Sequence, residues 1–328
     1  MSEPAVSEGA AAPLVATYGL TRSFAAGAQR VNAVDGVDLE IRAGETLALV
    51  GESGCGKTTL GRMLALLMLP SAGQLLIRGE DAAGLSRRQL KPLRRHVQMV
   101  FQDPVSSLNP RHPVESILTE PLQNFGLYPG AERQARVLEL LDAVGLAPRD
   151  LRRYPHEFSG GQRQRITLAR ALILNPDFIV ADEPVSALDV SVQSQILNLL
   201  VDLRTRFALT YLFISHDLAV VHHIADRIAV MYLGRIVELT DRDRLFANAG
   251  HPYTRALLAS VPEIRAGKRR IGRILPGDPP SPLSPPPGCR FHPRCAHASD
   301  VCRRESPPLA PAGDPDHLIA CHHAEALA

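Results

Sequence analysis

The segment GESGCGKT, residues 51–58, constrains the fold of this chain more than any other part of the sequence. It follows the apolar stretch ETLALVG, which is typical of a buried strand, and it precedes a stretch with helical spacing. In this context the pattern G-x-x-x-x-G-K-[ST], known as Walker A, predicts a loop that binds phosphate groups at the start of a helix. Because the loop needs a strand before it and a helix after it, it favours an α/β fold.

Further short apolar runs alternate with amphipathic stretches between Leu14 and about Leu239. Three of these runs lack the polar alternation of a half-exposed strand: residues 96–102, 178–184 and 210–217. Such runs are typical of a parallel sheet that is covered on both faces. We therefore predict the core of a P-loop NTPase, with a mixed, largely parallel sheet flanked by helices.

Two segments depart from this α/β pattern. Residues 103–157 hold two helical stretches with no strand between them, which predicts an inserted α-helical subdomain. The proline-rich segment PGDPPSPLSPPPG, residues 276–288, can form neither a helix nor a central strand. We expect a disordered lead at residues 1–13, a nucleotide-binding domain at residues 14–250 and a Pro/Cys-rich C-terminal extension at residues 251–328.

The phosphate loop offers the groups that bind the phosphates of ATP together with Mg²⁺. Its glycines let successive backbone N–H groups turn inward, and the helix that starts near Lys57 adds its positive dipole. We expect Lys57 to reach the β- and γ-phosphates and Thr58 to offer its hydroxyl to Mg²⁺. The predicted nucleotide contacts in this loop are Gly51, Ser53, Gly54, Cys55, Gly56, Lys57, Thr58 and Thr59.

Polar residues end three of the predicted strands. Asp182 closes the run FIVAD, and its carboxylate is expected to hold Mg²⁺ together with Thr58. Glu183 follows directly and is predicted to polarise the water that attacks the γ-phosphate; a turn cap or a surface ion pair is its alternative role. His216 and Gln102 end two neighbouring strands, at the edge where open α/β sheets bind ligands. We predict that His216 contacts the γ-phosphate, although a lone histidine at a strand end is more often structural, and that Gln102 senses Mg²⁺ and the γ-phosphate.

A second helix start, in EFSGGQRQRITLARAL at residues 157–172, also carries groups that bind anions. Ser159 and the backbone N–H groups of Gly160 and Gly161 would face a phosphate, with Gln162 in the same turn. The segment has no lysine or Mg²⁺ ligand beside it, so it is only half of a site. We predict that it completes the nucleotide site of a second polypeptide, so that two chains meet head to tail and enclose two ATP molecules.

In order along the chain, these motifs resemble those of ATP-binding-cassette (ABC) ATPases. They are GESGCGKTT, Gln102, FSGGQ, VADEP, SALD and His216, and the resemblance covers roughly residues 14–240. It implies ATP hydrolysis by the head-to-tail dimer. It also implies that Asp189 in SALD bridges the two protomers and that Phe24 stacks on adenine, with Tyr18 as the alternative.

Four further segments resemble the ATPase subunits of peptide importers, a group that includes nickel and glutathione importers: QDPVSSLNPR, YPHEFSGGQRQR, HPYTRALLASVP and GCRFHPRC. The stretches GESGCGKTTLGRMLALL and LNPRHPVESILTEPL are more similar to F-type than to D-type subunits. This resemblance implies a peripheral ATPase at the cytoplasmic face of the cell (inner) membrane that energises solute import. Its partners would be a paralogous D-type ATPase in a heterodimer, two membrane permease subunits and an extracytoplasmic solute-binding protein.

Four cysteines occur late in the chain with the spacing C-x5-C-x6-C-x18-C: Cys289, Cys295, Cys302 and Cys321. In a chain that is not expected to form disulfides, they favour a soft metal centre. The spacing lacks both the C-x2–4-C of structural zinc and the tight run of ferredoxins. The residues therefore leave the metal open, with four unliganded thiols as the alternative, whereas the resemblance implies a [4Fe–4S] cluster ahead of zinc.

The main alternative function is that of a soluble, non-transport ABC ATPase that acts on nucleic acid or ribosomes. Such proteins usually carry two cassettes or a long coiled-coil insertion, and this sequence shows one cassette and no such insertion. The net charge of +2, the lack of tryptophan and the aromatic content of 5% give no sign of a nucleic-acid surface. No run approaches the roughly 20 apolar residues of a membrane span, and no signal peptide is expected. The sequence leaves open a homodimer or a heterodimer, and dipeptide, oligopeptide, nickel or glutathione as the solute.

Overall fold

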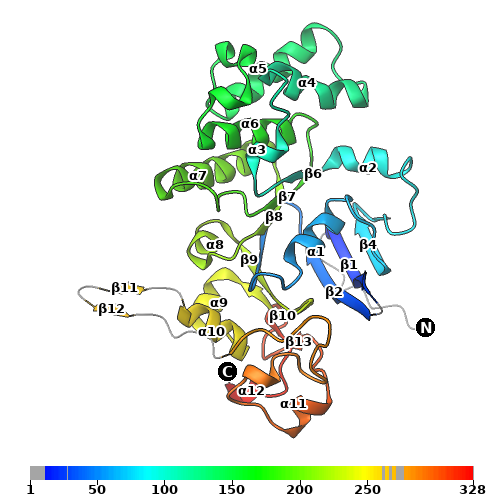
Figure 1. Cartoon of the computed structure of the whole chain (residues 1–328), viewed down its shortest axis with the longest axis vertical. Coiled ribbons are helices and arrows are strands. Elements are labelled where there is room, and N and C mark those ends of the chain that lie inside the picture. Colours follow the sequence, from blue (N-terminus) through cyan, green and yellow to red (C-terminus); the bar gives the residue numbers. More distant parts are fainter. Residues whose placement is uncertain (1–11, 28, 261–262, 266–267, 271–276, 328) are drawn as a thin grey trace.

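The computed structural model describes residues 12–27, 29–260, 263–265, 268–270 and 277–327. The expected disordered lead at residues 1–13 therefore lies almost entirely outside the described residues. Figure 1 shows a helical region, an α/β centre and a C-terminal region that follow one another along the longest axis, with a smaller sheet on one flank. No helix in the described ranges is long and apolar enough to cross a membrane.

The central sheet combines a parallel core with an antiparallel edge, in the order β13-β14-β10-β9-β3-β8-β7-β6. β9, β3, β8, β7 and β6 run parallel to one another, and β10, β14 and β13 pair in antiparallel fashion. Their bounds are β3 (Thr46–Val50), β6 (Val97–Val100), β7 (Phe178–Asp182), β8 (Thr210–Ile214), β9 (Arg227–Tyr232), β10 (Arg235–Asp241), β13 (Ala310–Pro311) and β14 (Leu318–Ile319). Every residue of β3, β7 and β8 is buried. The predicted α/β fold with a largely parallel sheet is confirmed.

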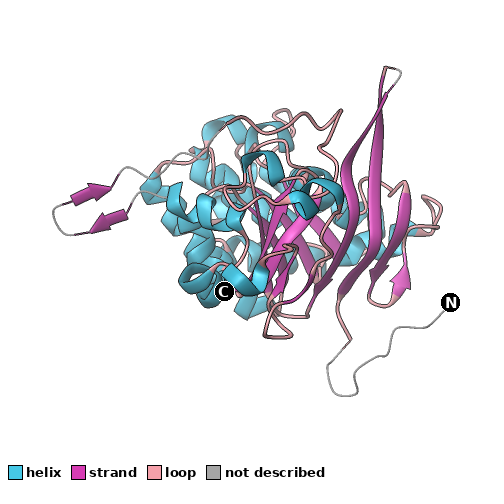
Figure 2. Cartoon of the chain, turned by 90° about the horizontal axis from the view of Figure 1, so that it is seen from below, coloured by secondary structure: helices cyan, strands magenta, loops and turns pink. Residues whose placement is uncertain are grey.

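A second, antiparallel sheet of order β2-β1-β4-β5 stands beside the central sheet (Figure 2). Its strands are β1 (Val15–Ala26), β2 (Gln29–Ile41), β4 (Ala72–Ile77) and β5 (Glu80–Asp81). Val15, Leu20 and Val34 on its inner face join the apolar cluster that contains Leu47 of β3 and Leu60. The sheet therefore shares a core with the strand and the helix that flank the phosphate loop. Two further short strands, β11 (Glu263–Arg265) and β12 (Lys268–Arg270), pair only with each other in the described residues.

Helices cover both faces of the central sheet. Val180 of β7 packs in the same cluster as Leu60 and Leu64 of α1, whereas its neighbour Ile179 packs in the cluster of Leu200 of α7. The α-helices are α1 (Lys57–Leu64), α2 (Leu90–His96), α3 (Pro104–Ser107), α4 (Val114–Phe125), α5 (Ala131–Ala143), α6 (Gly160–Leu172), α7 (Val190–Phe207), α8 (Leu218–Ile224), α9 (Arg242–Asn248), α10 (Pro252–Ser260), α11 (Asp300–Arg304) and α12 (Ala324–Leu327). The 3₁₀ helices are η1 (Pro148–Arg152), η2 (Pro155–Glu157) and η3 (His292–Arg294).

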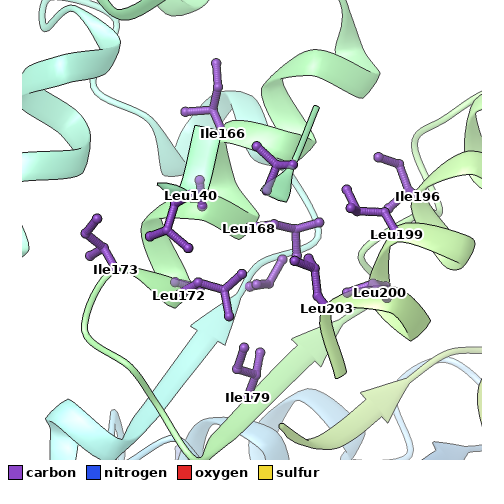
Figure 3. Packing of buried hydrophobic residues seen from close by; sticks show 14 of the residues in the cluster. Leu140, Ile166, Leu168, Leu172, Ile173, Ile179, Ile196, Leu199, Leu200 and Leu203 are labelled. Atoms are coloured by element: carbon purple, nitrogen blue, oxygen red, sulfur yellow. The ribbon is translucent and has the colours of Figure 1, made fainter. Parts of the chain in front are cut away.

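The helical region is held to the sheet by an apolar core between α5, α6, α7 and β7 (Figure 3). Leu140 of α5, Leu168 and Leu172 of α6, and Leu203 of α7 lie in this core together with Ile179. Each of these side chains is buried, so each removes apolar surface from water when the helices dock. This packing fixes the position of α6, whose first turn carries the segment FSGGQ.

Replacing Leu168 by alanine should lower the free energy of unfolding by about 2–5 kcal/mol, because the side chain is 1% exposed and its removal leaves a cavity. Leu67→Ala is the matched control, because Leu67 is 52% exposed and its loss should change stability by only about 0.5 kcal/mol. Urea unfolding followed by circular dichroism measures both changes. Equal stability of the two variants would contradict the core described here.

The C-terminal extension is joined to the central sheet through a buried carboxylate. β14 pairs with β10, with Glu238 opposite Ile319. Glu238 is fully buried, and it accepts hydrogen bonds from the backbone N–H groups of Gly250 (2.7 Å) and His251 (3.0 Å). The ring of His317, in the loop before β14, lies 2.7 Å from the same carboxylate. Gly250, at the end of the expected nucleotide-binding domain, and His251 and His317, in the expected extension, therefore share one buried carboxylate.

Candidate nucleotide-binding site

The phosphate loop connects β3 to α1, as the sequence predicts. Gly56 precedes α1 with φ of 110° and ψ of 0°, a left-handed conformation that a larger residue rarely adopts. A Cβ atom at Gly56 would lie 2.1 Å from the carbonyl oxygen of Ala33, and one at Gly51 would lie 2.2 Å from that of Met231. Both glycines are thus required by neighbouring backbone, which fixes the curvature of the loop.

Lys57 is the buried cation of the loop. Its Nζ donates hydrogen bonds to the carbonyl oxygens of Gly51 (2.7 Å) and Glu52 (2.9 Å), so the side chain folds back over the loop. An open cavity of about 430 Å³ lies above it and is lined by Ala33, Ser53, Gly54, Gly56, Lys57, Thr58, Thr59, Gln102, Glu183 and His216. The cavity brings residues from five separate segments to one place, at the carboxyl ends of the parallel strands.

Thr58 and Asp182 meet at the edge of this cavity. Asp182 ends β7, and its Oδ1 accepts a hydrogen bond from the hydroxyl of Thr58 at 3.2 Å. Burial raises the pKa of Asp182, and the neighbouring charge of Glu183 raises it further, while the hydrogen bond from Thr58 opposes the shift. A hydroxyl and a carboxylate held together in this way suit a hard cation such as Mg²⁺. The donor set therefore fits the predicted Mg²⁺ pair.

Glu183 lies at the centre of a three-residue contact formed by the ends of β6, β7 and β8. Its Oε1 is 3.0 Å from Nδ1 of His216, and its Oε2 accepts a hydrogen bond from Nε2 of Gln102 at 3.1 Å. The backbone of Glu183 is left-handed, with φ of 47°, and its N–H donates to the carbonyl oxygen of Ile214 at 3.0 Å. A non-glycine residue in this conformation is strained unless its surroundings hold it, and such strain gathers at functional sites.

The segment FSGGQ lies apart from the cavity over the phosphate loop. Ser159 caps α6: its Oγ accepts from the N–H of Gln162 at 3.3 Å, and its own N–H donates to Oε1 of Gln162 at 3.1 Å. Ser159 and Gly160 are exposed and Gly161 is half-buried. None of the four residues lines the 430 Å³ cavity among the described residues. Asp189, which precedes α7, is exposed as well. A single chain therefore does not bring the two predicted half-sites together.

The two aromatic candidates for adenine contact lie on β1, outside the described lining of this cavity. Phe24 is 37% exposed and has the guanidinium of Arg22 5.0 Å from its ring centre, a cation–π contact. Tyr18 donates a hydrogen bond to Glu40 at 3.4 Å and lines another cavity, of about 480 Å³, between β1, β2, β10 and the C-terminal extension. The adenine contact therefore stays a prediction.

Two residues from the C-terminal extension, for which the sequence predicts no role, also reach the phosphate loop. The hydroxyl of Tyr253 accepts a hydrogen bond from the N–H of Glu52 at 2.9 Å, and Arg294 forms an ion pair with the Glu52 carboxylate at 2.8 Å. Glu52 occupies a variable position of the G-x-x-x-x-G-K-[ST] pattern, so the motif itself gives no signal for these contacts.

The four late cysteines, Cys289, Cys295, Cys302 and Cys321, line one small pocket of about 10 Å³ together with several histidines. Burial raises the pKa of Cys289, Cys295 and Cys321, which favours neutral thiols. In the described part of the chain, no three His, Cys, Asp or Glu side chains are arranged to hold a metal ion. The predicted iron–sulfur or zinc centre therefore has no support from a preformed ligand geometry. Cys55 lies apart in the phosphate loop, where burial raises its pKa.

Family models match two parts of the chain. Residues 34–186 match the model described as "ABC transporter", and residues 237–302 match "Oligopeptide/dipeptide transporter, C-terminal region". The chain is 54% identical over 295 residues to the oligopeptide transport ATP-binding protein AppF of Bacillus subtilis, covering 89% of each chain. It is 50% identical over 308 residues to the di/tripeptide transport ATP-binding protein DppF of Pseudomonas aeruginosa, covering 94% of this chain and 95% of that protein.

Two solved structures share the fold. One is the ATP-binding cassette MJ0796 in a dimeric, post-hydrolysis state bound to ADP and Pi, at 31% identity, a TM-score of 0.63 and coverage of 70% of this chain and 98% of that chain. The other is cbiO1 of Clostridium perfringens, part of the ABC transporter complex cbiONQ, at 26% identity, a TM-score of 0.65 and coverage of 72% and 92%.

Proposed function

We propose that this chain hydrolyses ATP to drive the import of peptides or related solutes. The premise is its family: the chain belongs to the ATP-binding subunits of ABC transporters in the oligopeptide/dipeptide class. AppF and DppF carry peptide transport in their names, which supports a peptide as the solute. Both are transport subunits, and this gives no support to the alternative of a soluble ATPase that acts on nucleic acid or ribosomes.

The observation that carries ATP hydrolysis is the placement of Glu183. Its carboxylate lines the cavity above the phosphate loop and is held at both oxygens, by Gln102 and by His216. A fixed carboxylate in this position can take the proton of a water that lies in line with the γ-phosphate. Lys57 and the backbone N–H groups of the loop would stabilise the negative charge of the phosphates. Thr58 and Asp182 would hold Mg²⁺, which neutralises phosphate charge when it is bound.

The exposed FSGGQ segment supports a head-to-tail dimer as the working form. Ser159 and Gly160 offer a capped helix N-terminus to solvent, and such a terminus attracts phosphate oxygens. In a dimer, this terminus of one chain would face the γ-phosphate held by the loop of the other, and Asp189 would lie at the contact between the chains. The same geometry serves a homodimer or a heterodimer with a paralogous D-type subunit, and we propose the heterodimer.

Ser159→Arg should lower ATP turnover by roughly 30-fold, the effect of losing an interface hot spot of about 2 kcal/mol. The arginine adds bulk and charge to the surface that would meet the second chain. Nucleotide affinity of the dilute single chain should stay at the wild-type value, since Ser159 lies outside the described lining of the phosphate cavity. Ser281→Arg, on an exposed residue of the extension, is the control. Full turnover by Ser159→Arg would argue against the shared site.

We further propose that the chain lies at the cytoplasmic face of the cell membrane. Two permease subunits and an extracytoplasmic solute-binding protein would complete the importer. The test is uptake of a labelled tripeptide by cells that lack this chain. We expect uptake to be lost, to return with the wild-type chain and to stay lost with Glu183→Gln. Unchanged uptake in the deletion strain, with RNA or DNA bound to the purified chain, would instead favour the soluble ATPase.

For the cysteine pocket, we propose a thiolate-bound metal centre, a [4Fe–4S] cluster ahead of zinc. The support is that four cysteines from separated positions in the extension line one pocket. When bound, such a centre would cross-link the extension. The test is metal and sulfide analysis of protein purified without oxygen, with its visible absorption spectrum. Less than a tenth of an equivalent of iron or zinc, with four titratable thiols in the folded protein, would reject the proposal.

A further inference from the structure

Glu52, the second residue of the phosphate loop, is held by every polar group that it has. Its N–H donates to the hydroxyl of Tyr253 at 2.9 Å, and its carbonyl oxygen accepts from Nζ of Lys57 at 2.9 Å. Its carboxylate accepts from two nitrogens of Arg294, at 2.8 Å and 3.1 Å. Two of these three partners belong to the C-terminal extension and lie 201 and 242 positions further along the chain.

The ion pair between Arg294 and Glu52 has the geometry of a strong contact. The guanidinium binds both carboxylate oxygens, and such forked pairs fix orientation as well as position. The Arg294 side chain is 5% exposed and that of Glu52 is 25% exposed, so water screens the pair less than it would a surface pair. Removing one partner would leave a largely desolvated charge without its counterpart.

Tyr253 is itself fixed in place. Tyr253 is fully buried near the start of α10, and its N–H donates to Nδ1 of His251 at 3.0 Å. Burial lowers the pKa of His251 to about 4, so at neutral pH the ring is uncharged and can accept this hydrogen bond. The ring of Tyr253 packs against Tyr232 and Phe291, with ring centres 4.6 Å and 5.5 Å away. The extension thus presents a rigid surface to the loop.

We propose that Tyr253 and Arg294 are positioning residues for ATP binding, which act through Glu52 on the phosphate loop and on Lys57. A phosphate loop binds well only if its amides and its lysine already point at the phosphates. The extension holds the backbone N–H and the carboxylate of Glu52, through Tyr253 and Arg294. The carbonyl oxygen of Glu52 accepts a hydrogen bond from Lys57. The extension is then part of the nucleotide site. This inference rests on the proposed binding of ATP at the loop.

The same contacts connect the cysteine pocket to the nucleotide site. Arg294 directly precedes Cys295, which lines that pocket, and η3 carries both the arginine and the turn into the cysteine. Phe291, next to the helix, lines the pocket and packs against Tyr253. A change that displaces η3 therefore reaches Glu52 through one side chain, that of Arg294.

The experiment measures ATP affinity of the purified full chain by titration with a fluorescent ATP analogue. It measures KM and kcat by steady-state turnover of the dimer, which is the co-purified pair if the partner is a paralogous subunit. Arg294→Gln and Glu52→Gln should each weaken nucleotide binding and raise KM by about tenfold, within the usual range for coupling between sites. The double variant should lose no more ATP affinity than either single variant, because both substitutions remove the same ion pair. The value of kcat at saturating ATP should stay within about twofold, because Glu183, Gln102 and His216 are untouched.

A second, milder variant guards against loss of folding. Tyr253→Phe removes only the hydroxyl that accepts from Glu52 and keeps the buried ring, and it should weaken binding by about threefold to tenfold. Arg294→Lys keeps the charge but loses the fork, and should recover part of the affinity lost in Arg294→Gln. Thermal unfolding reports whether each variant is folded at the assay temperature. Arg304→Gln, exposed in α11 of the same extension, is the matched control and should bind as the wild type does.

The outcomes separate this inference from the proposed function. If Lys57→Ala loses affinity while the folded Arg294, Glu52 and Tyr253 variants bind ATP as the wild type does, the positioning role is wrong and the nucleotide site stands. If Lys57→Ala also binds normally, the site itself is wrong and the inference falls with it. A fall in kcat without a rise in KM would likewise overturn the assignment, because positioning of the loop acts on binding.

Discussion

Glu183→Gln should lower steady-state ATP turnover by about 10²–10⁴-fold, the usual contribution of a general base. Glutamine keeps the size of the side chain and one oxygen that Gln102 can still contact. It cannot accept the proton of the attacking water, because the amide is not basic. ATP binding should be preserved, since Lys57 and the loop amides are unchanged.

The same variant should accumulate as an ATP-bound dimer, since the bound nucleotide is not cleaved. Light scattering after size-exclusion chromatography, with and without ATP, measures this shift. If the partner is a paralogous subunit, the measurement is made on the co-purified pair. Glu80→Gln, on an exposed residue of β5, is the control and should show wild-type turnover and no trapped dimer. Turnover within twofold of the wild type in Glu183→Gln would remove Glu183 from the role of base.

Lys57→Ala should weaken ATP binding by roughly 10- to 150-fold, which corresponds to the loss of about 1.5–3 kcal/mol from charged hydrogen bonds. The ammonium group is the buried cation of the loop, tethered to the carbonyl oxygens of Gly51 and Glu52. Alanine removes the charge and leaves those carbonyl groups without their donor. Titration with a fluorescent ATP analogue measures the affinity.

The control for this second prediction is Lys91→Ala. Lys91 is exposed on α2, where its Nζ lies 5.5 Å from the ring centre of Phe125. Its removal should change neither nucleotide affinity nor turnover. Equal affinity of Lys57→Ala and Lys91→Ala would mean that the phosphates bind elsewhere.

Much of the central sheet and of the phosphate site could be predicted from sequence because each part carries a local signal. The strands β3, β7 and β8 are apolar runs that end in a glycine loop, an acidic pair and a histidine. Parallel strands bring such ends to one edge, so the meeting of Gln102, Glu183 and His216 follows from topology alone. The structure adds that both oxygens of Glu183 are held, which depends on side-chain geometry.

The contacts of the C-terminal extension could not be predicted in the same way. β13 and β14 contain two residues each and are too short for any periodicity, yet they extend the central sheet. The link from Arg294 to Glu52 spans 242 positions and joins two residue types that are usually exposed. The antiparallel sheet that carries Phe24 also went unpredicted, because β1 pairs with β2 through several register shifts that disturb its alternation.

The buried carboxylate of Glu238 has a consequence for engineering chimeric importers. Its counterparts, the N–H groups of Gly250 and His251 and the ring of His317, lie downstream of the strand that carries it. A hybrid whose crossover falls between β10 and α10 would combine this acid with a foreign tail, and an unmatched anion inside the sheet is costly. Hybrids between paralogues should therefore place the splice before Arg235, so that β10 and the C-terminal extension come from the same parent.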